Sequence, residues 1–80
     1  MKAAGIVASW MQQQAQQAGV PGLLATLGSW IGGGLAAELV SLWSATGAAG
    51  VIYFFGSYGW VMEVLMGPIG GIALWLGMIL

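Results

Sequence analysis

Residues 51–80 contain a single charged side chain, Glu63, and almost every other residue in this segment is apolar or glycine. A helix needs about 20 predominantly apolar residues to cross the roughly 30 Å hydrocarbon core of a bilayer. The segment 51–80 is long enough for this, and so is 22–43, whose one charge is Glu38. The sequence therefore predicts that lipid, or other copies of the chain, covers most of the surface.

The expected fold class is all-α, in one domain of 80 residues. A pair of strands in lipid would leave backbone groups unpaired unless it closed into a barrel, so helices are favoured. Pro21 lacks an amide proton and disfavours a helix at the residue before it, and Pro68 predicts a kink near 67–68. The expected elements are a short amphipathic helix, an apolar helix, a turn and a second apolar helix, at 3–18, 22–43, 44–50 and 51–80.

Glycine is unusually frequent, with fifteen among 80 residues. Each glycine inside a helix costs about 1 kcal/mol relative to alanine in water, whereas in lipid small residues let helix backbones approach closely. We expect an apolar helical hairpin that packs against many copies of itself and assembles into a helical filament. The alternative is that the glycines serve only the hairpin's own two helices. The residues expected to pack between subunits are Gly28, Gly32, Ala36, Gly59, Gly67, Gly70 and Gly71.

Several kinds of chemistry are excluded by composition. The chain has no cysteine and no histidine, which removes disulfides, thiolate and imidazole catalysis and the usual zinc ligands. Glu38 and Glu63 are the only acids, and in one hairpin they would lie at different depths. We therefore expect no enzyme activity, no metal and no cofactor. A single Lys and a net charge of −1 also argue against tight packaging of DNA.

Glu63 is the expected buried acid, because a carboxylate inside a bilayer is costly and marks a functional site by default. A glycine-rich first helix and a lone acid midway along the second resemble the rotor-ring subunit of rotary ATP synthases. That resemblance implies an ion-translocating rotor or small channel subunit that uses Glu63. The turn SATGAAG lacks the polar loop of that family. The alternative is a protonated Glu63, or one bonded to Ser57 or Tyr58, at a subunit contact.

The order of a short helix, two apolar helices about a tight turn and abundant glycine resembles the conjugative pilins of type IV secretion. Within that family it is most similar to the archaeal DNA-import pilus subunits. The resemblance covers the whole chain and concerns its architecture. It implies a subunit held in the cell membrane and extruded, by assembly machinery in that membrane, into an extracellular pilus at the cell surface. It also implies stoichiometric membrane lipid, and single-stranded DNA that passes through the lumen without tight binding.

Two groups of residues receive roles in this interpretation. The resemblance places the turn at the lumen, with Ser44, Thr46 and Gly47. Aromatic residues beside the turn are expected to contact lipid, because Trp and Tyr are enriched at membrane interfaces. These residues are Trp43, Tyr53, Phe54 and Phe55.

Three other classes stay open beside the pilus subunit. The first is the major coat protein of a rod-shaped or membrane-containing virus, which is weakened by the scarcity of cations. The second is the ion-translocating subunit that uses Glu63. The third is an accessory subunit of a larger membrane complex, in which the glycines would contact unlike partners.

Overall fold

Three glycines set the places where the chain changes direction. The computed structural model describes the backbone of residues 2–79 and the side chains of residues 3–71. Within it, Gly19, Gly32 and Gly47 have positive φ angles of 74°, 90° and 64°. Side chains of L-residues rarely tolerate such angles, whereas glycine adopts them readily. The positions of these glycines therefore determine where helices bend or end.

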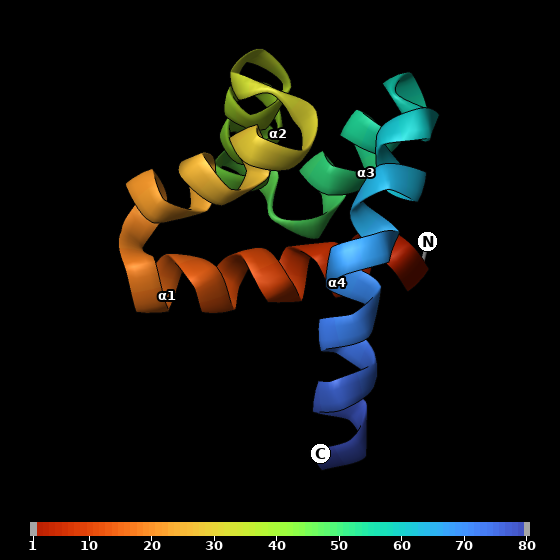
Figure 1. Cartoon of the computed structure of the whole chain (residues 1–80). Helices are drawn as coiled ribbons and strands as arrows, with labels where there is room; N and C mark the ends of the chain where they lie inside the picture. Colours follow the sequence, from red (N-terminus) through yellow and green to blue (C-terminus); the bar gives the residue numbers. More distant parts are fainter. Residues whose placement is uncertain (1, 80) are drawn as a thin grey trace.

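Residues 2–79 form four helices, which are separated at Gly32, Gly47 and Tyr58. Helix α1 (Lys2–Ile31) bends at Gly19, and α2 (Gly33–Thr46), α3 (Ala48–Ser57) and α4 (Gly59–Ile79) complete the chain. The expected all-α fold class is confirmed. In Figure 1 the first part of α1 lies below α2 and α3, and its second part turns back toward α2.

Both long apolar segments are divided in this fold. The segment 22–43 is interrupted at Gly32, where three consecutive glycines weaken the helix, and 51–80 is interrupted at Tyr58. Because each apolar segment forms two shorter helices, these helices pack against one another and bury part of their apolar surface. Within the described residues, none of the helices combines the length and the hydropathy that crossing a membrane requires. The structure thus has four packed helices where the sequence predicted a hairpin of two long ones.

The connections are also shorter than expected. Helix α2 continues through Ser44 to Thr46 and α3 begins at Ala48, so Gly47 alone forms the turn. Its amide donates a hydrogen bond to the carbonyl oxygen of Trp43. Helix α4 runs on through Pro68 without an interruption. The turn expected at 44–50 is therefore mostly helical.

The core is organised around α1, which contacts α2, α3 and α4. Its inward residues recur every three or four positions, the spacing that places side chains on one face of a helix. Within the described residues, no charged or polar side chain is buried. The buried apolar residues are Ala4, Val7, Trp10, Met11, Leu23, Leu27, Ile31, Ala36, Leu39, Val40, Val51, Phe54, Phe55, Val61, Leu65 and Ile69.

Aromatic contacts connect distant parts of the chain. The rings of Trp10 and Trp30 lie 5.2 Å apart, which joins the two parts of α1 across the bend at Gly19. Phe54 is fully buried and its ring contacts those of Phe55 and Tyr58, at centroid distances of 5.9 Å and 5.1 Å. Such pairs stabilise a core by about 0.5–1.5 kcal/mol beyond the area that they bury.

Candidate functional site

The glycines divide into two sets according to what surrounds them. At Gly50 an added Cβ would overlap the carbonyl of Leu42, and at Gly22 an added Cβ would lie 2.5 Å from the Cβ of Ala18. Both glycines therefore serve the chain's own packing. A second set has ordinary helical backbone. Apart from each glycine's chain neighbours and the nearby backbone of its own helix, no described heavy atom lies within 4 Å of the position of an added Cβ. This set comprises Gly5, Gly33, Gly34, Gly56, Gly59, Gly67, Gly70 and Gly71.

Helix α4 carries four of the glycines in the second set, and most of them lie on its exposed side. We define the outer face of α4 as Trp60, Glu63, Val64, Gly67 and Gly71, whose spacing of three and four residues places them on one side of the helix. Trp60 and Val64 are 55% and 41% exposed. The opposite side faces the core with Val61, Leu65 and Ile69. Apart from Glu63, the outer face is therefore apolar, with large side chains at its start and none at Gly67 and Gly71.

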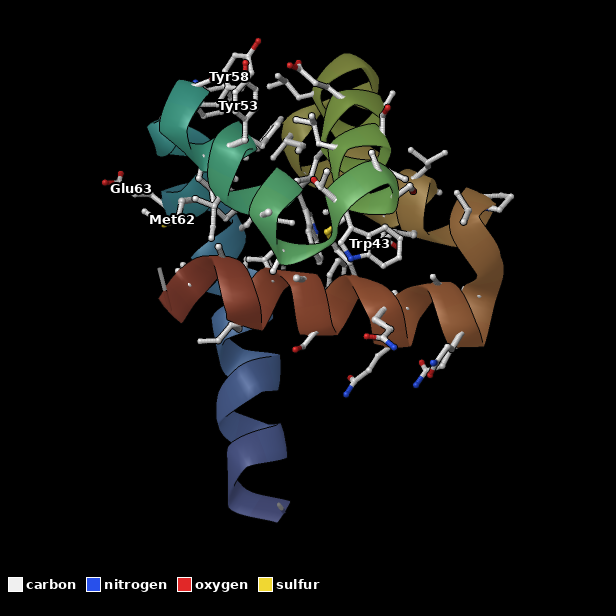
Figure 2. The ribbon with its side chains drawn as sticks, turned by 180° about the vertical axis from the view of Figure 1, so that it is seen from behind. Trp43, Tyr53, Tyr58, Met62 and Glu63 are labelled. Carbon is white, nitrogen blue, oxygen red and sulfur yellow. The ribbon has the colours of Figure 1, made fainter. Side chains whose placement is uncertain are left out.

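The end of α4 leaves the rest of the molecule. In Figure 1 the helix descends past α1, and its C-terminal part projects beyond the other three helices. The view from behind in Figure 2 shows the same projection. The sequence at 72–79 is IALWLGMI, which contains no polar residue. The backbone of this segment thus extends away from α1, α2 and α3.

Further apolar side chains are exposed on α1 and α3. Val20 and Ile52 are 44% and 43% exposed, and Tyr53 is 67% exposed. By contrast, the amide side chains of the glutamine-rich part of α1 project away from α2 and α3 (Figure 2). The molecule therefore presents one neutral polar strip and several apolar surfaces.

Glu63 lies on the outer face of α4, where its side chain is exposed and points away from the helices (Figure 2). The fold of the single chain therefore does not bury this acid. Within the described residues it forms no hydrogen bond with Ser57 or Tyr58. Glu38 is exposed on α2, and α2 and α4 make no contact in the described part of the chain. The two carboxyl groups are thus held on separate helices.

Comparison with known proteins adds no assignment. No protein-family model, curated protein or solved structure matches the chain. Within the described residues, no group of acids could hold a metal ion. The functional argument therefore depends on the surfaces of the chain itself.

The predicted packing residues are divided between the surface and the interior. On α4, Gly59, Gly67 and Gly71 are exposed, and Gly70 is half-buried with free space at its Cβ position. Elsewhere the chain uses the predicted residues for its own fold. Gly32 forms the bend between α1 and α2, Ala36 is buried in the core, and Gly28 lies against Gly33. Among the predicted packing residues, the four α4 glycines are thus the ones that remain available to a second molecule.

The residues predicted to contact lipid are divided in the same way. Tyr53 is exposed and Trp43 is half-buried (Figure 2). Phe54 and Phe55 instead belong to the core, because the side of α3 that carries them faces the helices packed against it. In this fold they contact the chain's own residues rather than lipid.

We expect Phe54→Ala to lower the free energy of unfolding by about 3–5 kcal/mol, because it leaves a cavity in a fully packed site. The neighbouring change Tyr53→Ala removes a mostly exposed ring and should cost less than about 1 kcal/mol. Chemical denaturation followed by circular dichroism, in one solvent for all variants, measures both values. Equal effects of the two changes would show that α3 is rotated from the orientation described.

The turn offers little to a charged ligand. Ser44 and Thr46 are exposed at the end of α2, and Gly47 follows them. The hydroxyl of Thr46 donates to the carbonyl oxygen of Leu42 at 3.1 Å, so it is engaged within its own helix. Thr26 makes the same type of bond to Gly22 at 3.0 Å. Such bonds satisfy hydroxyl groups in apolar surroundings.

Two features of the surface and core were not predicted from the sequence. Trp60 and Val64 belong to the outer face of α4. Their spacing relative to Gly67 and Gly71 indicates a shared side of the helix but not that this side is exposed. The indole Nε1 of Trp10 is buried and has no hydrogen-bond partner among the described atoms. No sequence pattern indicates that second feature. An unpaired buried donor costs about 1–3 kcal/mol.

Proposed function

We propose that this chain is the structural subunit of a self-assembling helical filament, whose copies pack through the outer face of α4. The observation that carries the proposal is the set of helical glycines with no neighbour within 4 Å of an added Cβ. Each costs about 1 kcal/mol relative to alanine. No contact within the described fold offsets that cost. Glycine at these positions lets the backbone of a second helix approach closely, whereas a side chain would prevent that approach. Packing of a second helix would therefore explain why glycine occupies these positions.

The distribution of exposed apolar residues supports a filament. Such residues occur on α1, α3 and α4, at Val20, Ile52, Tyr53, Trp60 and Val64. One subunit can therefore contact more than one neighbour. Contacts between unlike surfaces form rings if the rotation closes and helical filaments if it does not.

The location of the subunit follows from its composition. Hydrophobic residues make up 60% of the chain and charged residues 4%, far below the roughly 25% charged residues of ordinary soluble domains. We propose that the subunit lies in the cell membrane before assembly and in an extracellular filament afterwards. Membrane lipid in stoichiometric amount would then cover exposed residues such as Tyr53 and Ile52.

Transfer or uptake of DNA is the part of the proposal that rests on the resemblance to conjugative pilins. The short turn at Gly47 and the residues before it carry no charge. A neutral wall would let single-stranded DNA pass without strong phosphate contacts, since tight binding requires several cations. Assembly machinery in the membrane would extrude the filament.

Negative-stain electron microscopy of the purified material, with lipid extraction from the same sample, tests the proposal. Long thin tubes that contain stoichiometric lipid are expected. Rods with nuclease-resistant nucleic acid would instead identify a viral coat protein. A sample without any regular assembly, over a wide range of concentration and pH, would contradict the filament proposal.

One observation favours the ion-translocating alternative, namely the exposure of Glu63 on a face of α4 that is otherwise apolar. In that alternative the carboxyl group would exchange ions or protons with a partner, and the assembly would be a closed ring. Labelling of Glu63 by a hydrophobic carbodiimide, with loss of ion flux in vesicles, would support it. Tubes that form equally well after labelling would exclude a role for the free acid.

A further inference from the structure

A single residue, Gly32, connects α1 to α2. Its amide donates a hydrogen bond to the carbonyl oxygen of Gly28 at 2.9 Å, and its own carbonyl oxygen accepts one from the amide of Ala36 at 3.0 Å. The helical bonding pattern therefore reaches Gly32 from both sides, and its φ and ψ angles of 90° and 152° interrupt the helix. The first amides of α2 have no partner within their own helix, and a helical backbone at Gly32 would pair them with the last carbonyl groups of α1.

The other two breaks between helices are held by packing. Across the turn from α2 to α3, Gly50 lies directly against the carbonyl group of Leu42. At the break between α3 and α4, the ring of Tyr58 lies 5.1 Å from that of the buried Phe54. At Gly32, by contrast, no described heavy atom other than those of its chain neighbours lies within 4 Å of an added Cβ. Gly32 is therefore the point where α2–α4, as one unit, can move relative to α1.

A helical backbone at Gly32 would separate α1 from the rest of the chain. Helix α1 contacts α2, α3 and α4, and its buried residues, such as Val7, Met11 and Leu27, would lose those contacts. The same contacts can form again between α1 of one copy and α2–α4 of another, because the structure already pairs these surfaces. Short, strained connections favour such exchange, which is a low-cost route to dimers.

We propose that two copies of this chain exchange α1, with Gly32 becoming helical in both, so that each α1 packs against α2–α4 of the other copy. The partner is thus a second copy, and the surface is the one that buries α1 in the single chain. The exchanged dimer contains every core contact twice and adds backbone hydrogen bonds at both hinges. This association is separate from filament packing through the outer face of α4.

The first test compares alanine at two neighbouring glycines. Alanine strains the positive φ angle of Gly32 in the single-chain fold but suits a continuous helix. Gly32→Ala should therefore lower the dissociation constant of the dimer by about 100-fold, roughly tenfold for each of the two chains. Gly34 is already helical and has free space at its Cβ position, so Gly34→Ala should leave this constant unchanged. Size-exclusion chromatography with light scattering, over a range of concentrations in one solvent, measures both.

The second test distinguishes exchange from contact between intact copies. Leu27 of α1 and Leu65 of α4 are fully buried, so Leu27→Asp and Leu65→Asp should each abolish cooperative unfolding. Both variants also carry Gly32→Ala and are refolded separately or as a mixture. In an exchanged mixed dimer, α1 of the Leu65→Asp chain packs against α2–α4 of the Leu27→Asp chain. That unit contains neither aspartate, so the mixture should regain a cooperative transition by circular dichroism.

The results decide the exchange independently of the filament. A dimer of Gly32→Ala together with a restored transition in the mixture would support exchange. Gly32→Ala that stays as monomeric as Gly34→Ala would overturn it. A dimer whose mixture shows no restored transition would also overturn it, because intact copies would then associate without exchanging α1. Filaments of the unmodified chain are scored separately by electron microscopy, so either proposal can fail while the other stands.

Discussion

Gly67→Leu is expected to abolish filament assembly while the chain still folds. Apart from its chain neighbours and the nearby backbone of its own helix, no described atom lies within 4 Å of a Cβ at Gly67. The next residue, Pro68, disfavours helical geometry at a residue that carries a Cβ, whereas leucine is a better helix former than glycine by about 1 kcal/mol, so these two effects on the fold oppose each other. On the outer face of α4, however, the leucine occupies the space proposed for a neighbouring backbone. Overpacking by about 3 kcal/mol would raise the critical concentration roughly 100-fold.

Sedimentation and electron microscopy measure the loss of assembly, and circular dichroism measures the retained fold. Gly5→Leu is the control, because Gly5 also has free space at its Cβ position but lies on α1. Gly32→Leu would not serve as a second test, since its φ of 90° makes any side chain strain the bend between α1 and α2. Normal filaments from Gly67→Leu would refute packing through the outer face of α4.

Gly50→Ala is expected to have the largest effect on the fold itself. The added Cβ would strike the carbonyl oxygen of Leu42 and lie 2.6 Å from the hydroxyl oxygen of Thr46. These atoms belong to the backbone and the last turn of α2, which cannot move without separating α2 from α3. We expect the free energy of unfolding to fall by about 3 kcal/mol or more.

Gly56→Ala provides the matched control for Gly50→Ala. Both glycines are in α3, but nothing in the described structure lies within 4 Å of a Cβ at Gly56. That change should stabilise the fold slightly, by up to about 1 kcal/mol, through helix propensity alone. Chemical denaturation of the two variants side by side compares their free energies of unfolding. If Gly50→Ala proved as stable as Gly56→Ala, the described packing of α2 on α3 would be contradicted.

The helical fold class could be read from the sequence, whereas two of the helix boundaries could not. Pro21 identifies the bend that the structure places at Gly19, because proline restricts the backbone around it. The three consecutive glycines at 32–34 weaken a helix without requiring that it end there, and the break at Tyr58 has no comparable signal. An apolar segment can form one long helix in lipid, or it can form two shorter helices that pack together and bury apolar surface. The composition of the segment is the same in both cases. Tertiary contacts decide between these outcomes.

The candidate site was predictable to a similar extent. The spacing of Gly59, Gly67 and Gly71 places them on one side of a helix wherever that helix packs, so a sequence pattern was sufficient. The spacing of Gly28, Gly32 and Ala36 would place them on one side of a straight helix. Because the chain bends at Gly32, these residues do not share one straight helix. The rotation of a helix about its own axis is fixed by its contacts with several other helices. Sequence spacing alone cannot specify that rotation.

Adjacent residues of α3 illustrate the same limit. Tyr53 is exposed and its neighbour Phe54 is fully buried, although both are aromatic. Which of them faces outward depends on the helices that pack against α3. The exposure of Val64 and Trp60 on α4 has the same origin.

The most direct test of packing through the outer face of α4 uses a single cysteine as a reporter, since the natural chain has none. Val64→Cys places a thiol on this face, and Gln16→Cys places one on the exposed polar strip of α1. We predict that a water-soluble maleimide labels both variants in dispersed subunits. In filaments it should label only Gln16→Cys. Equal labelling of Val64→Cys in filaments and in dispersed subunits would contradict the account.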